Sequence, residues 1–292
     1  MKELEKIFKT PLPAQNAPDV FFNQLDKTWM HDKINENGLT FSIYPSEING
    51  GVEDDGSVEY KINRQYFRSD DFKQNHENKK HILFAGCSET EGVGSPSDTV
   101  WAKVLYDKIF EKEELSGYFN IGRAGAGWEK IISLFLIYEK DYGTPDELYI
   151  ILPNLCRFYE WTEEGYDHGF KYVQRSWHDG LVTEGRYREE LIRFLMGWKL
   201  FERYCESKNI KLIWGTWEHL DNWHYKNIGV FNHFVELPAN ENANETDAFK
   251  KLIQEKRPTG KMLKYDLRRR DSHHGVLVHE FWASIFLENR EK

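Results

Sequence analysis

The stretch that decides the fold is His81 to Gly94, which reads HILFAGCSETEGVG. Its first part is a short apolar run that ends at Gly86, the pattern of a strand buried on both faces of a parallel sheet. Ser88 lies just past this predicted strand, where open α/β sheets place their ligands. Glycines on both sides of a serine allow a sharp turn and the close approach of a substrate. The stretch therefore predicts either a nucleophile at Ser88 or an ordinary polar loop between a strand and a helix.

Apolar segments of strand and helix type alternate from His81 to the end of the chain, which favours an α/β fold with a parallel sheet and helices on both faces. Asp98-Thr99 is the expected N-cap of the first long helix. The predicted strands are 81–86, 117–121, 148–152 and 211–217, and the predicted helices are about 99–114, 128–142, 186–208 and 276–289.

The 292 residues suit one large α/β domain with additions. Residues 1–78 lack the alternating pattern and are expected to form an N-terminal extension that packs on the core, with short strands at 39–44 and 58–62 as a hairpin or a sheet edge. Residues 79–292 are the expected domain, with insertions at about 159–185 and 218–260.

Composition limits the class of partner. The chain has 39 basic and 48 acidic residues, a net charge of −9, so we expect no binding to nucleic acid or to an anionic membrane surface. With no apolar signal segment and no run long enough to span a membrane, a cytoplasmic location is expected. The aromatic fraction of 15% would suit a groove for a flat substrate such as a sugar, besides the buried core.

Two further predicted strand ends carry groups suited to an oxyanion. Gly125 lies in a glycine-rich turn before a helix, where backbone N–H groups face an anion. Asn154 follows the strand at 148–152 and has an amide that donates hydrogen bonds, although it is also a common turn residue. Arg157 is a candidate for binding the substrate, with a surface ion pair as the alternative.

Acyl transfer also requires a base and a carboxylate that orients it. Asp271, His273 and His274 stand together before the last helix and follow Ser88 in the chain. The other histidines between 218 and 260 match no zinc pattern, and we expect neither a metal nor an organic cofactor.

These motifs resemble the SGNH hydrolases, the GDSL-type esterases and lipases. Gly86-Cys-Ser-Glu-Thr-Glu-Gly92 is similar to the family's first block, Asn120-Ile-Gly-Arg-Ala-Gly125 to the second, and Asp271-Ser-His-His274 to the fourth. The third block is similar only in Asn154. The resemblance implies a flavodoxin-like three-layer α/β/α sandwich, Ser88 as nucleophile, His274 as base, Asp271 as its orienting carboxylate, and an oxyanion hole of Ser88, Gly125 and Asn154.

Two positions depart from the family pattern. Cys87 replaces the usual aspartate, so it is an alternative nucleophile, although a cysteine packed under the turn is the commoner use. Spacing from Asp271 favours His274 as the base, whereas spacing back from Gly275 favours His273. The pattern around Ser88 looks closest to SGNH-like proteins of tailed bacteriophages and marine bacteria, which implies a viral or bacterial source and, in a phage, a virion-associated location.

Hydrolysis of an ester is the reaction implied, with an O-acetyl group on a carbohydrate as the suggested small-molecule or carbohydrate substrate. Two alternatives stay open from the sequence. The same residues would support transfer of the acyl group to a sugar hydroxyl. A non-catalytic module that binds carbohydrate or belongs to a virion would also keep this fold, because fold does not settle function.

Overall fold

The computed structural model describes residues 39–43, 58–155, 157, 184–237, 247–258 and 273–292. The described elements, in chain order, are β1 (Leu39–Ile43), β2 (Val58–Ile62), β3 (Ile82–Gly86), α4 (Ser88–Glu91), the 3₁₀ turn η2 (Ser97–Thr99), α5 (Trp101–Phe110), β4 (Phe119–Asn120), α6 (Trp128–Tyr142), β5 (Glu147–Leu152), α7 (Glu184–Ser207), β6 (Lys211–Thr216), α8 (His219–Ile228), β7 (Phe234–Glu236), α10 (Asp247–Lys256) and α11 (Val276–Arg290).

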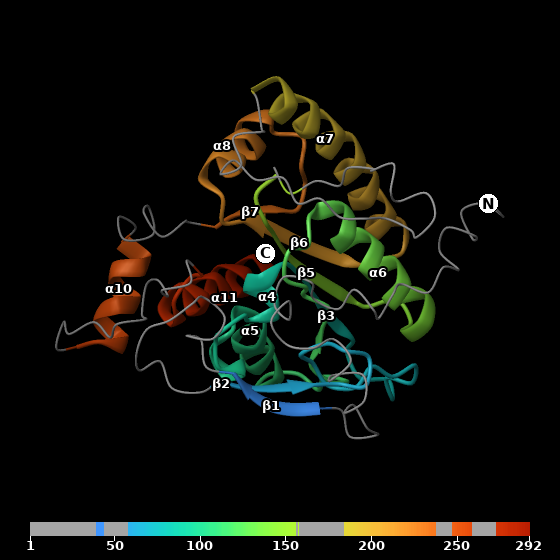
Figure 1. The fold of residues 1–292 in the computed structure, drawn as a ribbon, viewed down its shortest axis with the longest axis vertical. Coiled ribbons are helices and arrows are strands. Elements are labelled where there is room, and N and C mark those ends of the chain that lie inside the picture. The colour runs from blue at the N-terminus through green and yellow to red at the C-terminus, as the bar shows by residue number, and fades with distance from the viewer. Residues whose placement is uncertain (1–38, 44–57, 156, 158–183, 238–246, 259–272) are drawn as a thin grey trace.

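A parallel sheet of five strands forms the centre of the fold, in the order β4-β3-β5-β6-β7 (Figure 1). The chain goes from β3 to β4 on one side and later to β5 on the other side of β3. This reversal of strand order places the topological switch point at the carboxyl ends of β3 and β5, the usual ligand position in open α/β sheets. The loop with Ser88 follows β3, and the loop with Asn154 follows β5.

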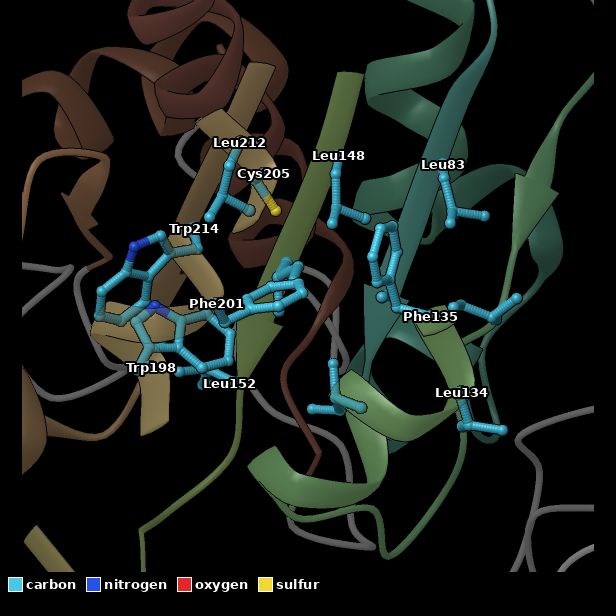
Figure 2. Close-up of a cluster of buried hydrophobic side chains, with 14 of the residues drawn as sticks. Leu83, Leu134, Phe135, Leu148, Leu152, Trp198, Phe201, Cys205, Leu212 and Trp214 are labelled. Carbon is cyan, nitrogen blue, oxygen red and sulfur yellow. The ribbon is translucent and has the colours of Figure 1, made fainter. Parts of the chain in front are cut away.

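Helices cover both faces of the sheet, so the fold is a three-layer α/β/α sandwich (Figure 1). All five residues of β3 and all six of β5 are buried, as the continuous apolar runs predict for strands covered on both sides. Helices α6 and α7 pack on one face and α5 and α11 on the other. Figure 2 shows the first of these cores, in which Trp198 and Phe201 of α7 lie beside Leu152 and Trp214 of the sheet.

Most of the regular elements agree with the sequence pattern because the apolar residues recur at strand or helix spacing. The predicted strands at 81–86, 117–121, 148–152 and 211–217 are confirmed as β3, β4, β5 and β6, and the predicted helices at 128–142, 186–208 and 276–289 as α6, α7 and α11. The hairpin is confirmed too, since β1 and β2 pair with each other antiparallel as a separate two-stranded sheet.

Two local predictions are wrong or incomplete. The N-cap of α5 is Val100 without a side-chain hydrogen bond, because Ser97–Thr99 form a 3₁₀ turn and move Asp98-Thr99 outside the cap position. The sequence pattern also misses β7, whose three residues are too few for a periodic signal and are specified by pairing with β6.

The predicted insertion at 159–185 lies almost entirely outside the described residues.

Candidate functional site

Ser88 lies directly after the central strand, as the first residue of the one-turn helix α4. The turn before it requires glycine, because a Cβ on Gly86 would lie 2.0 Å from Thr90 Oγ1 and 2.7 Å from the Ile151 carbonyl oxygen. Helix α4 ends at Gly92, which has a left-handed conformation with φ of +78°. The segment expected as a polar loop is therefore a short helix, and Ser88 within it is buried at 6% exposure.

The glycine-rich turn after β4 packs against this helix. A Cβ on Gly122 would lie 2.5 Å from the Glu91 backbone nitrogen, so only glycine allows the close approach. The Ala124 backbone N–H donates to Glu91 Oε2, which ties the turn to α4. Gly125 has a φ of +73°, also left-handed. The structure thus brings the first and second blocks together, and the oxyanion role of Gly125 stays a prediction.

Arg68, in the segment between β2 and β3, contacts the loop that follows α4. Its guanidinium donates to the Gly92 carbonyl and, at 2.7 Å, to the Ser95 carbonyl. The guanidinium carbon also lies 4.1 Å from the centre of the Tyr60 ring. The region before β3 therefore helps to hold the loop that follows Ser88.

Asn154 and Arg157 lie in a turn after β5. The Arg157 backbone N–H donates to the Asn154 carbonyl at 3.1 Å, and a Cβ on Gly127 would lie 2.1 Å from the Arg157 carbonyl oxygen. The turn therefore packs on the start of α6. No ion pair of the Arg157 side chain occurs among the described residues. Burial raises the pKa of the Cys87 thiol and the charge of Arg157 opposes that rise, which places Arg157 in the electrostatic surroundings of Cys87.

A buried aspartate in α8 holds the turn from the other side. Asp221 Oδ2 accepts from the Leu155 backbone N–H at 2.8 Å, and Oδ1 accepts from the Tyr187 hydroxyl at 2.6 Å. Burial raises the pKa of Asp221 to about 7, against the effect of these two hydrogen bonds and with a further rise from Glu218. No feature of the sequence around Asp221 predicts this role, because its partners come from the turn after β5 and from α7.

His274, just before α11, lies against the residue next to Ser88. Its Nδ1 is 2.8 Å from Glu89 Oε1, and its backbone N–H donates to the same oxygen at 3.3 Å. The two side chains are buried, and the rings of Trp217 and Trp282 lie 5.3 and 4.6 Å from the imidazole, centre to centre. Of the two candidate histidines, the structure therefore gives His274 the carboxylate contact.

Asp271 and His273 are the other predicted members of the catalytic group. Asp271 lies outside the described residues, so its orienting role stays a prediction. His273 is half-buried beside this cluster and its charge acts on Glu89. Within the described part of the chain the Ser88 hydroxyl forms no hydrogen bond with His274, and such catalytic bonds are often loose before substrate binds.

His279 of α11 contacts the other oxygen of Glu89. The Trp101 backbone N–H donates to His279 Nδ1 at 3.3 Å, and because a backbone N–H only donates, the ring hydrogen must be on Nε2. This Nε2 lies 3.4 Å from Glu89 Oε2. Burial lowers the pKa of His279, which favours the neutral ring.

Glu89 is held as a carboxylate by these neighbours. Burial by itself raises the pKa of its carboxyl, but the charge and the hydrogen bond of His274 and the contact of His279 bring that pKa well below 4.5. Sequence reasoning missed Glu89 as a site residue. The one signal was its position beside the candidate nucleophile, since an acidic residue between a buried strand and a glycine needs a buried partner.

The described residues contain neither a metal-binding cluster nor a membrane-spanning helix. No group of three or more histidine, cysteine, aspartate or glutamate side chains there is arranged to hold a metal ion. In the same part of the chain, no helix has the length and apolar character needed to cross a membrane.

Comparison with known proteins gives a structural similarity. No family model matches the sequence, and no curated protein matches it. Among solved structures, the chain is similar to a protein from Desulfitobacterium hafniense DCB-2 that is described as a lipolytic protein of the G-D-S-L family. The two are 13% identical, the match covers 73% of this chain and 99% of that chain, and the TM-score is 0.42.

Proposed function

We propose that the protein is a serine esterase of the SGNH type, with Ser88 as the nucleophile and His274 as the base. The proposal is carried by one observation: a buried histidine contacts, through Nδ1, a carboxylate on the residue next to the serine. The resemblance of the sequence blocks supports the same assignment, and it adds Asp271 as a carboxylate for the histidine.

The tautomer of His274 suits this chemistry. A carboxylate only accepts, so the hydrogen is on Nδ1, and Nε2 is the basic nitrogen. In the first step Nε2 takes the proton from Ser88 Oγ as Oγ attacks the ester carbonyl carbon. The oxyanion collapses, the carbon–oxygen bond to the alcohol breaks, and the alcohol leaves with the proton from Nε2. Water then attacks the acyl-serine with the same base, and the acid is released from a regenerated Ser88.

Donors for the oxyanion are proposed from three places near the switch point. They are the Ser88 and Gly125 backbone N–H groups and the Asn154 side-chain amide. Loss of one such donor typically lowers kcat by about 10²–10³-fold.

An O-acetyl group on a carbohydrate is the proposed substrate. Trp217 follows β6, and its half-buried indole lies beside His274, where an aromatic ring would pack on a sugar face. Arg157 is the proposed contact for a polar or acidic group of the same substrate, because its side chain is engaged in no ion pair within the described residues.

Labelling with a fluorophosphonate tests the nucleophile directly. The native protein is expected to gain one adduct by intact mass, and Ser88→Ala is expected to gain none. Cys87→Ala is expected to keep the adduct, as is Ser97→Ala, a matched control for an exposed serine nearby. No adduct on the native protein would favour the binding-module alternative, and loss only in Cys87→Ala would identify the cysteine as the nucleophile.

Activity is then measured on 4-nitrophenyl acetate and on acetylated oligosaccharides. Ser88→Ala is expected to lower kcat on the order of 10⁵-fold. Product analysis with free sugar as acceptor separates hydrolysis from acyl transfer, because transfer gives a new sugar ester in place of acetate.

A further inference from the structure

We propose that Glu89, the residue beside the nucleophile, is the carboxylate that orients His274, and that His279 positions Glu89. This inference rests on the proposed esterase function. It departs from the assignment of the orienting role to Asp271, which the sequence resemblance implies.

The hydrogen on His274 Nδ1 has one acceptor at hydrogen-bond distance in the described structure. Nδ1 carries a single hydrogen, and Glu89 Oε1 takes it at 2.8 Å. The same oxygen also accepts the His274 backbone N–H at 3.3 Å, so it fixes both the ring and the backbone of that residue. A second carboxylate would have to share this hydrogen or replace Glu89.

The other oxygen of Glu89 has its own contact on α11. The Trp101 backbone N–H, at the start of α5, fixes the tautomer of His279, so that its Nε2 carries the hydrogen and lies 3.4 Å from Glu89 Oε2, without forming a hydrogen bond to it. A histidine therefore contacts each oxygen of Glu89, His274 by a hydrogen bond and His279 by a longer contact. Such an arrangement keeps the carboxylate from turning away from His274, in the way that outer partners orient catalytic groups.

Glu89 stays ionised throughout the proposed reaction. It takes no proton from His274 and stabilises the imidazolium that forms when Nε2 accepts the serine proton. The titratable groups that face Glu89 are His273 and His274 from the segment before α11, His279 from α11, and the adjoining Cys87.

The test compares Glu89→Gln with Asp271→Asn in the full chain, using fluorophosphonate labelling rates and steady-state ester hydrolysis. Glu89→Gln is expected to lower kcat on the order of 10²–10⁴-fold with little change in KM. In Glu89→Gln the acid limb of the pH profile of kcat/KM is expected to move to lower pH, because the imidazolium of His274 loses its nearby negative charge. Asp271→Asn is expected to lower kcat by a smaller factor than Glu89→Gln does.

His279 is tested as a positioning residue. His279→Phe is expected to lower kcat on the order of 10-fold with KM unchanged, and His279→Gln, which keeps an N–H donor, is expected to recover part of that loss. Should Glu89→Gln fail to fold, Glu89→Asp keeps the charge but shortens the side chain. That variant is expected to lower kcat while keeping the acid limb of the native enzyme.

The outcomes separate this inference from the proposed function. A native protein with no adduct on Ser88 rejects the esterase itself. If the native enzyme is active and Asp271→Asn lowers kcat more than Glu89→Gln does, the assignment of the orienting role to Glu89 is rejected. Equal kcat in His279→Phe and the native enzyme rejects the positioning role.

A separate observation concerns the outer face of α7. Ile192, Met196 and Leu200 are 58%, 67% and 66% exposed, and their spacing of four residues places them in one stripe along the helix. Helix α7 lies at the margin of the molecule (Figure 1), and its opposite face is buried in the core. We call these three residues the α7 stripe.

The α7 stripe is self-complementary. Ile192 and Leu200 lie four residues on either side of Met196, and the exposed Glu189 and Arg203 lie seven residues on either side. At 100° per residue all five fall within one narrow band of the helix. In two antiparallel copies related by a two-fold axis at Met196, Ile192 meets Leu200 of the second copy and Glu189 meets Arg203 of the second copy.

We infer that the α7 stripe binds a second copy of this chain. Three apolar side chains and two charged ones from each copy form a small interface. Small interfaces are weak, so dissociation constants on the order of 10–100 µM are expected. Sedimentation velocity over a concentration series is expected to show a monomer–dimer equilibrium. Met196→Glu is expected to abolish it, because it places two like charges on the axis. Phe110→Glu, at an exposed position of α5, is the matched control and is expected to leave it intact.

Charge exchange gives the sharper test. Glu189→Arg or Arg203→Glu alone is expected to weaken the dimer, because each places like charges opposite each other, and the double exchange is expected to restore it. A chain that stays monomeric throughout, a dimer that Met196→Glu leaves intact, or a double exchange that restores nothing would each reject the inference.

Discussion

Glu89, in α4, and Asp221, in α8, are both buried carboxyl groups near the loops at the carboxyl edge of the sheet, and their pKa values move in opposite directions. Burial raises the pKa of both, but three histidines surround Glu89 and bring its pKa well below 4.5. Asp221 has only neutral donors and a second acidic neighbour, and its pKa rises to about 7. The difference teaches that the charge of the neighbours, and not burial alone, decides which carboxyl remains ionised.

The largest expected effect is the pH dependence contributed by Asp221. Its folded pKa of about 7 exceeds the ordinary aspartate value of 3.8, so the folded state binds this proton more tightly. The stabilisation is complete below about pH 4 and is lost as the pH rises to 7, in total roughly 4 kcal/mol. Urea unfolding at about pH 4.5 and pH 8 should show this loss in the native protein and not in Asp221→Asn. A native protein that gains stability relative to the variant over this range would contradict it.

The stabilisation that Glu89 contributes is expected to depend on pH in the opposite direction. Because its folded pKa is lowered, its stabilisation is present above the ordinary glutamate pKa of 4.5 and is lost as the pH falls below that value. At pH 7, Glu89→Leu leaves the backbone N–H and the Nδ1–H of His274 buried without their acceptor, and about 3 kcal/mol of unfolding free energy should be lost.

Urea unfolding at pH 7 measures this loss, with Glu255→Leu on the exposed face of α10 as the control. The control is expected to change the unfolding free energy by less than about 0.5 kcal/mol. A loss in Glu89→Leu as small as that of the control would show that the histidine cluster contributes little to stability.

The smallest expected change in unfolding free energy comes from removing one of the two hydrogen-bond donors to Asp221. Tyr187→Phe removes the hydroxyl that donates to Oδ1 and should cost about 1 kcal/mol. An ionised carboxylate is the stronger acceptor, so the loss should be greater at about pH 8 than at about pH 4.5. Unfolding of the variant at both pH values measures it, and equal losses would mean that Asp221 has the same charge at both.

Much of the fold could be predicted because burial on both faces leaves a strong local signal. The apolar run of β3 and the helical spacing in α6 and α11 were sufficient for their positions. Ser88 could be predicted as a candidate because glycines flank it directly after a strand. The three-residue strand β7 could not be predicted, since it is defined by its pairing with β6 rather than by its own residues.

The alternation of strands and helices and the candidate serine follow from residues that are close together in the chain, so they can be read from local patterns. The contacts of His274 and His279 with Glu89, more than 180 positions away, and of Asp221 with the turn that follows Asn154 arise from the packing of distant segments. A buried charge needs a partner within a few ångströms, and strand order, not chain order, brings that partner there.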